Sequence, residues 1–171
     1  MSKDQICQCI KSLDQQRCAL LDQLESADEA KLMHKPKPED WSALGIAQHL
    51  MLSEHFMLEN LPDHSTLKPK KASLKGKLMY PVATFVLNKN ISVSAPPQVT
   101  PDDSLSLSEL RQKWDESQAW LKTLSQCDAA ELEQALINHP ILGPLPTLKL
   151  VQFIQTHFDY HNRQIQQRLA S

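Results

Sequence analysis

Histidine is the residue type best suited to chemistry in this 171-residue sequence, and two of the seven histidines stand four residues apart. These two are His157 and His161. A helix places residues i and i+4 on one face, which is what two ligands of one metal ion require. His161 also falls in an apolar row with Val151, Ile154, Phe158 and Ile165. Imidazoles that face an apolar core need partners for their nitrogens, because unpaired buried polar groups are costly.

His49 presents the same pattern in an earlier helical segment. Its row contains the small residues Ser42, Gly45 and Ser53. A glycine inside a helix costs about 1 kcal/mol, and one reason to tolerate it is the close approach of another group. If the two helices are neighbours, the imidazole of His49 lies close to those of His157 and His161. Three neutral imidazoles can bind a divalent ion while leaving coordination positions open. The alternative is a set of histidines that are hydrogen-bonded to core carbonyls.

The other histidines are expected to have smaller roles. His139 is followed by Pro140 just before the last helical segment, so it is expected to order that loop, and it could also reach the mouth of the site. His34 and His64 lie in polar loop sequence and are expected to be exposed. His55 is six positions after His49, so it points elsewhere, to the surface or the rim.

Other catalytic motifs are missing from the sequence. It contains no G-x-S-x-G, no H-E-x-x-H and no paired E-x-x-H. Glu54 and Glu59 are expected to face solvent or an interface rather than to act as catalytic bases.

The cysteines form no C-x-x-C pair, which agrees with a reducing compartment. Their side chains are expected to be buried or half-buried: Cys7, Cys9, Cys18 and Cys127.

Four long amphipathic segments are predicted to be helices. They run from about Asp4 to Met33, from Asp40–Ser42 to Pro62, from Ser106 through Leu124, and from Thr147 through Leu169. Ser106 and Glu109 form a capping box. The predicted fold is an all-α four-helix bundle in one domain, residues 1–171. Six of its residues are expected to be largely buried: Leu13, Leu107, Trp114, Leu121, Ile154 and Phe158.

Residues 63–103 are too long for a simple helix–helix connection and predict a crossover insert between the second and third helices. Within it, 74–89 is expected to form a short helix broken at Pro81, and 94–98 an extended chain. The crossover is expected to lie over one end of the bundle. Its lysines are expected to form a solvated loop rather than an anion site: Lys68, Lys70, Lys71, Lys75 and Lys77.

Composition excludes several classes of protein. With 3 Gly, 4 Phe, 3 Trp and 2 Tyr, the chain lacks the turn and strand residues of β-sandwiches and barrels, and its isolated glycines form no phosphate-binding loop. A net charge of −2 gives no field that would attract nucleic acid. The N-terminal sequence is polar, and no apolar run reaches the ~20 residues that span a bilayer. We therefore expect a cytoplasmic protein with no nucleic-acid or membrane partner.

Two motifs resemble those of a known family. The stretch from Asp40 to Leu50, DWSALGIAQHL, is similar to the helix-two signature of the DinB-like superfamily, which includes YfiT-like proteins and thiol-dependent S-transferases. HPILGPL from His139 and HFDYHNRQI from His157 are similar to its C-terminal signature. The resemblance implies a metal-binding four-helix bundle with zinc or nickel on His49, His157 and His161. It also implies homodimers.

The function expected from these observations is metal-dependent. A metal ion that is held by three histidines and has open coordination positions could catalyse hydrolysis of a small molecule or transfer of a low-molecular-weight thiol. Gln164, three residues after His161, is expected to support that ligand from a second shell, where His139 is the other candidate. The alternatives are a metal-containing bundle without catalysis, acting as a structural or interaction module, and a metal-free helical module.

Overall fold

The computed structural model describes residues 3–59, 74–89, 91, 94–133, 137–139 and 141–170. Most of these residues are helical, which confirms the all-α prediction at that level. The elements, in chain order, are α1 (Lys3–Glu25), α2 (Glu29–Leu32), α3 (Ala43–Leu58), α4 (Leu74–Asn88), a 3-10 turn (Pro97–Val99), α5 (Leu107–Thr123), a second 3-10 turn (Leu124–Gln126), α6 (Ala129–Glu133), β1 (Ile137–His139), β2 (Gly143–Leu145) and α7 (Thr147–Ala170).

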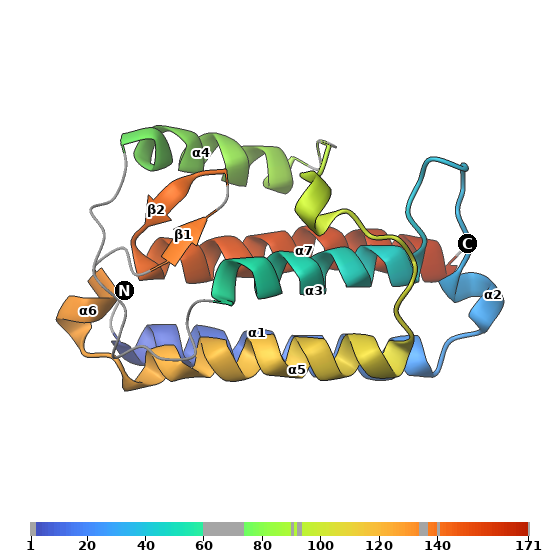
Figure 1. Cartoon of the computed structure of the whole chain (residues 1–171), viewed down its shortest axis with the longest axis horizontal. Coiled ribbons are helices and arrows are strands. Elements are labelled where there is room, and N and C mark those ends of the chain that lie inside the picture. The colour runs from blue at the N-terminus through green and yellow to red at the C-terminus, as the bar shows by residue number, and fades with distance from the viewer. Residues whose placement is uncertain are drawn as a thin grey trace.

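The four long helices pack side by side in two layers (Figure 1). α3 contacts both α5 and α7, and α1 contacts the same two helices. Apolar stripes from all four helices meet in a common core. Five of the six predicted core residues are buried: Leu13, Trp114, Leu121, Ile154 and Phe158. Leu107 is only partly buried because it is the first residue of α5, where no preceding helical turn packs beside it.

The helix termini follow the local chemistry of the sequence. Ser42 caps α3, its hydroxyl accepting a hydrogen bond from the N–H of Gly45 at 2.9 Å. Ser106 and Glu109 form the predicted capping box of α5. α7 begins at Thr147.

The first predicted helix, 4–33, is two helices. α1 ends at Glu25, the chain turns at 26–28, and α2 follows. The turn lets Leu32 reach the core, where it is buried, while α2 contacts α3 and α7. A continuous helix would have carried Leu32 beyond the end of the layers.

The second predicted helix, expected to run to Pro62, is α3, which ends at Leu58. Pro62 lies outside the described residues.

The insert before α5 differs from its prediction in two ways. α4 continues through Pro81 instead of breaking there. A proline leaves the carbonyl four residues earlier without its N–H partner, and here that residue, Lys77, is exposed, so water can replace the bond. α4 also lies along α7 and β2 rather than over one end of the helices (Figure 1). Part of the stretch expected to be extended forms the 3-10 turn Pro97–Val99.

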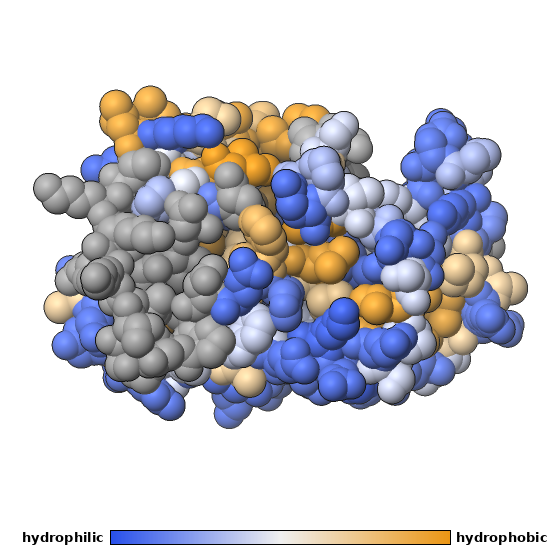
Figure 2. Space-filling view, viewed as in Figure 1, coloured by the Kyte–Doolittle hydropathy of each residue, from blue (hydrophilic) through white to orange (hydrophobic). Residues whose placement is uncertain are grey.

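The surface of α4 is partly apolar. Figure 2 shows hydrophobic residues gathered along this helix. Four of its large apolar side chains are at least half exposed: Leu74, Leu78, Val82 and Phe85. Isolated exposed apolar residues are ordinary, but four on one helix mark a surface that could receive a partner.

A two-stranded antiparallel hairpin replaces the loop expected before the last helix. β1 and β2 pair Ile137 with Leu145 and His139 with Gly143. Gly143 has a φ of 74°, a conformation that favours glycine. The hairpin contacts α4 and α7, so it brings His139 back over the long helices.

Glu54 is buried, which contradicts the expectation that it faces solvent or an interface. Its side chain is 1% exposed, and its carboxylate accepts a hydrogen bond of 2.6 Å from the amide of Gln118. α3 packs against both α5 and α7, and the Glu54 side chain points toward Gln118 of α5. Nearby, the buried Arg17 pairs with Asp14 at 2.9 Å and with Asp115 at 2.7 Å. Burial raises the pKa of Glu54 to about 7, an effect that the side chains of Trp114 and Gln118 partly oppose.

Most of the remaining expectations about side chains are confirmed. Glu59 and His34 are exposed, and His55 is half-buried at the rim, with its ring 4.7 Å from that of Trp120. The four cysteines are free and buried or half-buried. Lys75 and Lys77 are exposed, whereas His64, Lys68, Lys70 and Lys71 lie outside the described residues. No helix in the described part of the chain is long and apolar enough to cross a bilayer.

Candidate metal centre

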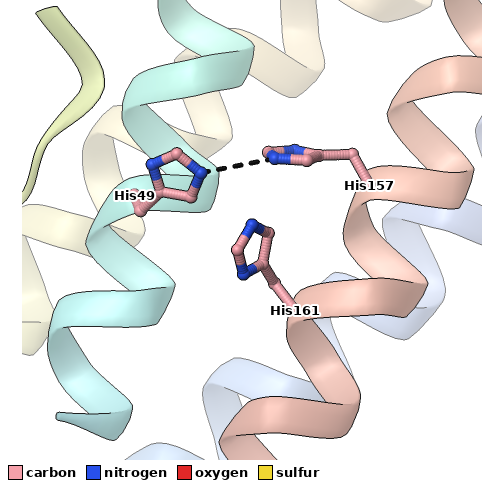
Figure 3. A group of neighbouring side chains, drawn as sticks. All are labelled: His49, His157 and His161. Atoms are coloured by element: carbon pink, nitrogen blue, oxygen red, sulfur yellow. Dashed lines mark hydrogen bonds between the residues drawn. The ribbon is translucent and has the colours of Figure 1, made fainter. Parts of the chain in front are cut away.

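Three histidine rings meet between α3 and α7 (Figure 3). His49 comes from α3, while His157 and His161 come from successive turns of α7. The Nε2 atoms of His49 and His157 are 3.3 Å apart. The ring of His161 lies 4.7 Å from that of His49 and 4.6 Å from that of His157, measured between centroids. One nitrogen from each ring lies within 4.8 Å of the other two, so the group could hold a metal ion.

The proton positions on two of these rings are determined by hydrogen-bond acceptors. The Nδ1 of His49 donates to the backbone carbonyl of Val99 at 2.7 Å. The Nδ1 of His161 donates to the side-chain oxygen of Gln164, also at 2.7 Å. A neutral imidazole has one N–H, so the Nε2 atoms of both rings carry lone pairs, and that of His49 accepts a hydrogen bond from Nε2 of His157 at 3.3 Å (Figure 3). These lone pairs are what a metal ion binds.

The electrostatic environment keeps the rings neutral. Burial lowers the pKa of His161 to about 3, reinforced by the neighbouring His49. Burial also lowers the pKa of His49, although its hydrogen bond to Val99 opposes the change. The pKa of His157 is held well below its usual range by burial first, and then by the histidines around it. All three are therefore neutral near pH 7, which is the form that coordinates metal.

A loop after α4 holds the carbonyl that orients His49. The side chain of Gln48 donates to the carboxylate of Asp102 at 2.7 Å and accepts from the N–H of Asp103 at 3.1 Å. These bonds fasten the segment that carries Val99 against α3. The sequence did not indicate this acceptor, because it is a backbone group and its residue type carries no signal.

Gly45 allows that loop to approach. A Cβ at Gly45 would stand 2.8 Å from a carboxylate oxygen of Asp103, closer than real Cβ atoms come. Asp103 has a φ of 56°, and its other carboxylate oxygen pairs with Lys35 at 2.7 Å. The helical glycine does mark a close approach, as its row predicted, and the approaching group is this aspartate.

An apolar chamber opens beside the three histidines. Its volume is about 340 Å³, and its walls come from α4, the 94–96 segment, the hairpin and α7. A second, smaller cavity of about 80 Å³ shares several of the lining residues and reaches Ser53 and Met57. The three histidines form one wall, and α4 forms the facing wall through side chains such as Met79 and Val86.

His139 lines both cavities and orders the hairpin turn. Its Nδ1 accepts hydrogen bonds from the N–H groups of Ile141 and Leu142, each at 3.1 Å. The ordering role predicted for this histidine is therefore confirmed. Its ring stands edge-on to Phe153, at 4.6 Å between centroids, and Phe153 stacks on His157. The ring of Phe153 therefore lies between His139 and the candidate ligand His157.

The geometry fits a divalent ion held by nitrogen. Two nitrogens bound tetrahedrally at 2.0–2.1 Å from zinc stand about 3.3–3.4 Å apart. The 3.3 Å between the Nε2 atoms of His49 and His157 has this value. The donor set contains imidazoles and no carboxylate, a composition that suits zinc, nickel or copper rather than magnesium or calcium.

Comparison with known proteins agrees with this arrangement. The family model described as the DinB superfamily matches residues 12–165. No curated protein and no solved structure matches the chain. The family match covers well over half of the chain and includes His49, His157 and His161. The chain therefore belongs to the DinB superfamily.

Proposed function

We propose that this chain is a metal-dependent enzyme that acts on a small molecule, with zinc or nickel held by His49, His157 and His161. The observation that carries the proposal is the convergence of three neutral imidazoles on the wall of an apolar chamber. A structural ion needs no such chamber. A three-nitrogen ligand set also leaves coordination positions open, as catalytic sites do.

When bound, a divalent ion would supply Lewis-acid chemistry, which makes water or a thiol nucleophilic near neutral pH. The residues of the chain have separate tasks around it. The Val99 carbonyl and the Gln164 amide hold protons on Nδ1, so that the Nε2 atoms of His49 and His161 stay available. The apolar walls exclude water from the reacting groups.

Two reaction classes use this chemistry: hydrolysis of a small molecule, and transfer of a low-molecular-weight thiol. Both begin with a nucleophile made next to the three histidines. The described lining of the chamber has no carboxylate, so no aspartate or glutamate there can serve as a general base. The non-catalytic alternative is an ion that joins α3 to α7, and it becomes one outcome of the tests below.

Metal content distinguishes the metal-binding proposals from a metal-free module. Purified protein should contain zinc or nickel in stoichiometric amount, and His49→Ala should lose it. His55→Ala is the matched control, because His55 lies on the same helix, is half-buried and is outside the cluster. Retention of metal by His49→Ala, or equal loss in both variants, would contradict the assignment.

Activity distinguishes the enzyme from the structural bundle. Metal-loaded and chelator-treated protein should be compared on an ester panel and on a labelled low-molecular-weight thiol with an electrophilic acceptor. We expect turnover that requires metal and disappears in His49→Ala. Metal binding with no turnover on any member of the panel would favour the structural alternative.

The remaining architecture and assembly are proposed on the same basis. The packing of α1, α3, α5 and α7 supports a single-domain four-helix bundle with residues 63–103 as a crossover insert. We also propose a cytoplasmic homodimer. The dimer buries the exposed apolar side chains of α4, such as that of Leu78, which is 66% exposed.

Sedimentation should give a dimer for the wild type and a monomer for Leu78→Asp. A monomeric wild type would contradict the dimer.

A further inference from the structure

The chamber beside the three histidines has an unusually uniform lining. Apart from the histidines, its described walls are apolar or aromatic side chains, and the one hydroxyl, Ser94, is exposed at the margin. Among the described residues, the lining contains no lysine, arginine, aspartate or glutamate. A charged group on a ligand would find no opposite charge there, and burying it unpaired is costly. The occupant must therefore be uncharged where it touches these walls.

The size of the chamber limits the occupant as well. About 340 Å³ holds roughly 11 groups the size of a water molecule, each taking about 30 Å³. This is the space of a small bicyclic ring. Met79, Val86 and Phe153 contribute flexible and flat apolar surface against which such a ring can pack.

Besides the three candidate ligands, His139 brings a polar atom to the lining of this space. The Nδ1 of His139 accepts two backbone N–H groups, so the proton of the neutral ring is on Nε2. That N–H has no hydrogen-bond partner among the described residues, although the His139 side chain is 5% exposed and lines the chamber. An N–H donor in such a place is satisfied by an acceptor oxygen on a ligand.

We propose that the substrate is an uncharged, mainly apolar small molecule of about bicyclic size, whose carbonyl-type oxygen accepts a hydrogen bond from Nε2 of His139. This inference rests on the proposed function, because it takes the occupant of the chamber to be the substrate of the three-histidine site. The apolar body lies against α4 and Phe153, and the polar end lies toward the histidines. Small thiols that carry several charges fit these walls poorly.

The test uses metal-free protein of full length and four probes: three that share the naphthalene ring system, and glutathione. 2-Acetylnaphthalene offers a carbonyl oxygen, 2-ethylnaphthalene offers none, and 2-naphthoate carries a charge; glutathione represents the charged thiols. Binding is followed by quenching of tryptophan fluorescence, since Trp41 lines the chamber, and by calorimetry. We expect the ketone to bind best, and naphthoate and glutathione to bind at least tenfold more weakly.

Variants identify the walls and the donor. Val86→Asp places a charge in the chamber and should weaken both neutral probes more than tenfold, while Asn88→Asp adds the same charge to an exposed position of α4 and should change neither. If Val86→Asp does not fold, Ala83→Leu fills the chamber without a charge and should weaken the same probes. His139→Asn keeps an acceptor near the position of Nδ1 but removes the Nε2–H. It should weaken the ketone about fivefold and leave 2-ethylnaphthalene unchanged.

Several results would overturn the proposal. They are naphthoate or glutathione binding as tightly as the ketone, neutral probes that bind Val86→Asp normally, and a ketone preference that survives in His139→Asn. Because the probes are tested without metal, these results are independent of the metal-content measurement. Failure of the three-histidine assignment would appear as a loss of the expected metal content, whereas failure of the ligand class would appear in the binding of these probes.

Discussion

Replacing Glu54 with glutamine should remove a loss of stability that the wild type suffers at alkaline pH. Glu54 is 1% exposed, and burial raises its pKa from an ordinary 4.5 to about 7. A carboxyl group whose pKa is raised by folding stabilises the folded state fully below pH 4.5, and this contribution disappears as the pH rises through 7. Glutamine keeps the oxygen that accepts from Gln118 at 2.6 Å and has no proton to lose.

The magnitude follows from the two pKa values. The shift corresponds to about 3 kcal/mol in total, of which about 2 kcal/mol is lost between pH 5.5 and 8.5. The free energy of unfolding of Glu54→Gln, measured relative to the wild type by urea denaturation, should therefore rise by about 2 kcal/mol across that range. Histidines that titrate in the same range are common to both proteins, so their contributions cancel in the difference.

Glu59→Gln is the control, because Glu59 follows α3 directly and is exposed. Its difference from the wild type should not change with pH. A flat difference for Glu54→Gln would refute the reasoning, since it would mean that Glu54 ionises in the folded protein as easily as in the unfolded one. A difference that falls with pH would mean that the nearby Arg17 stabilises the carboxylate more than burial destabilises it.

Three further predictions concern the metal centre. Gln164→Leu removes the acceptor for Nδ1 of His161 and should lower metal affinity by about 10- to 100-fold in a chelator competition, whereas Gln167→Leu, an exposed position of α7, should not. Metal content should stay constant from pH 7.5 to about 6 and fall below about pH 5, since burial lowers the histidine pKa values and protons compete only in acid; half-loss at pH 6.5 would contradict this. Removing the metal should lower Tm by only about 5–10 °C with the circular dichroism still helical, because the apolar core remains; unfolding on chelation would make the ion structural.

The convergence of the histidines could be predicted because it depends on helical periodicity. His157 and His161 share a face by their spacing alone, and His49 lies in a row with the small residue Gly45. The acceptor on the other side of His49 could not be found this way. It is the Val99 carbonyl, a backbone group, and its position depends on the bonds between Gln48 and a loop more than fifty residues away.

The errors in the fold have a common cause, since each depends on contacts distant in sequence. Glu54 was expected outside because carboxylates are rarely buried, but α3 packs against two other long helices, and the Glu54 side chain points toward α5. Pro81 was expected to break a helix, but its missing bond falls on the exposed side of α4. The position of α4 along α7 and the hairpin depends on packing, and local propensity gives no information about it.

The chamber also divides the protein into two parts that could be changed separately. The histidines belong to α3 and α7, which are long helices fixed by the common core. The facing wall belongs to connections between long helices, namely α4, the 94–96 segment and the hairpin. Connections tolerate exchange better than core helices do. Transplanting a different 74–96 segment should therefore alter which molecules enter while the ligand set stays intact, making this wall the natural target for redesigning selectivity.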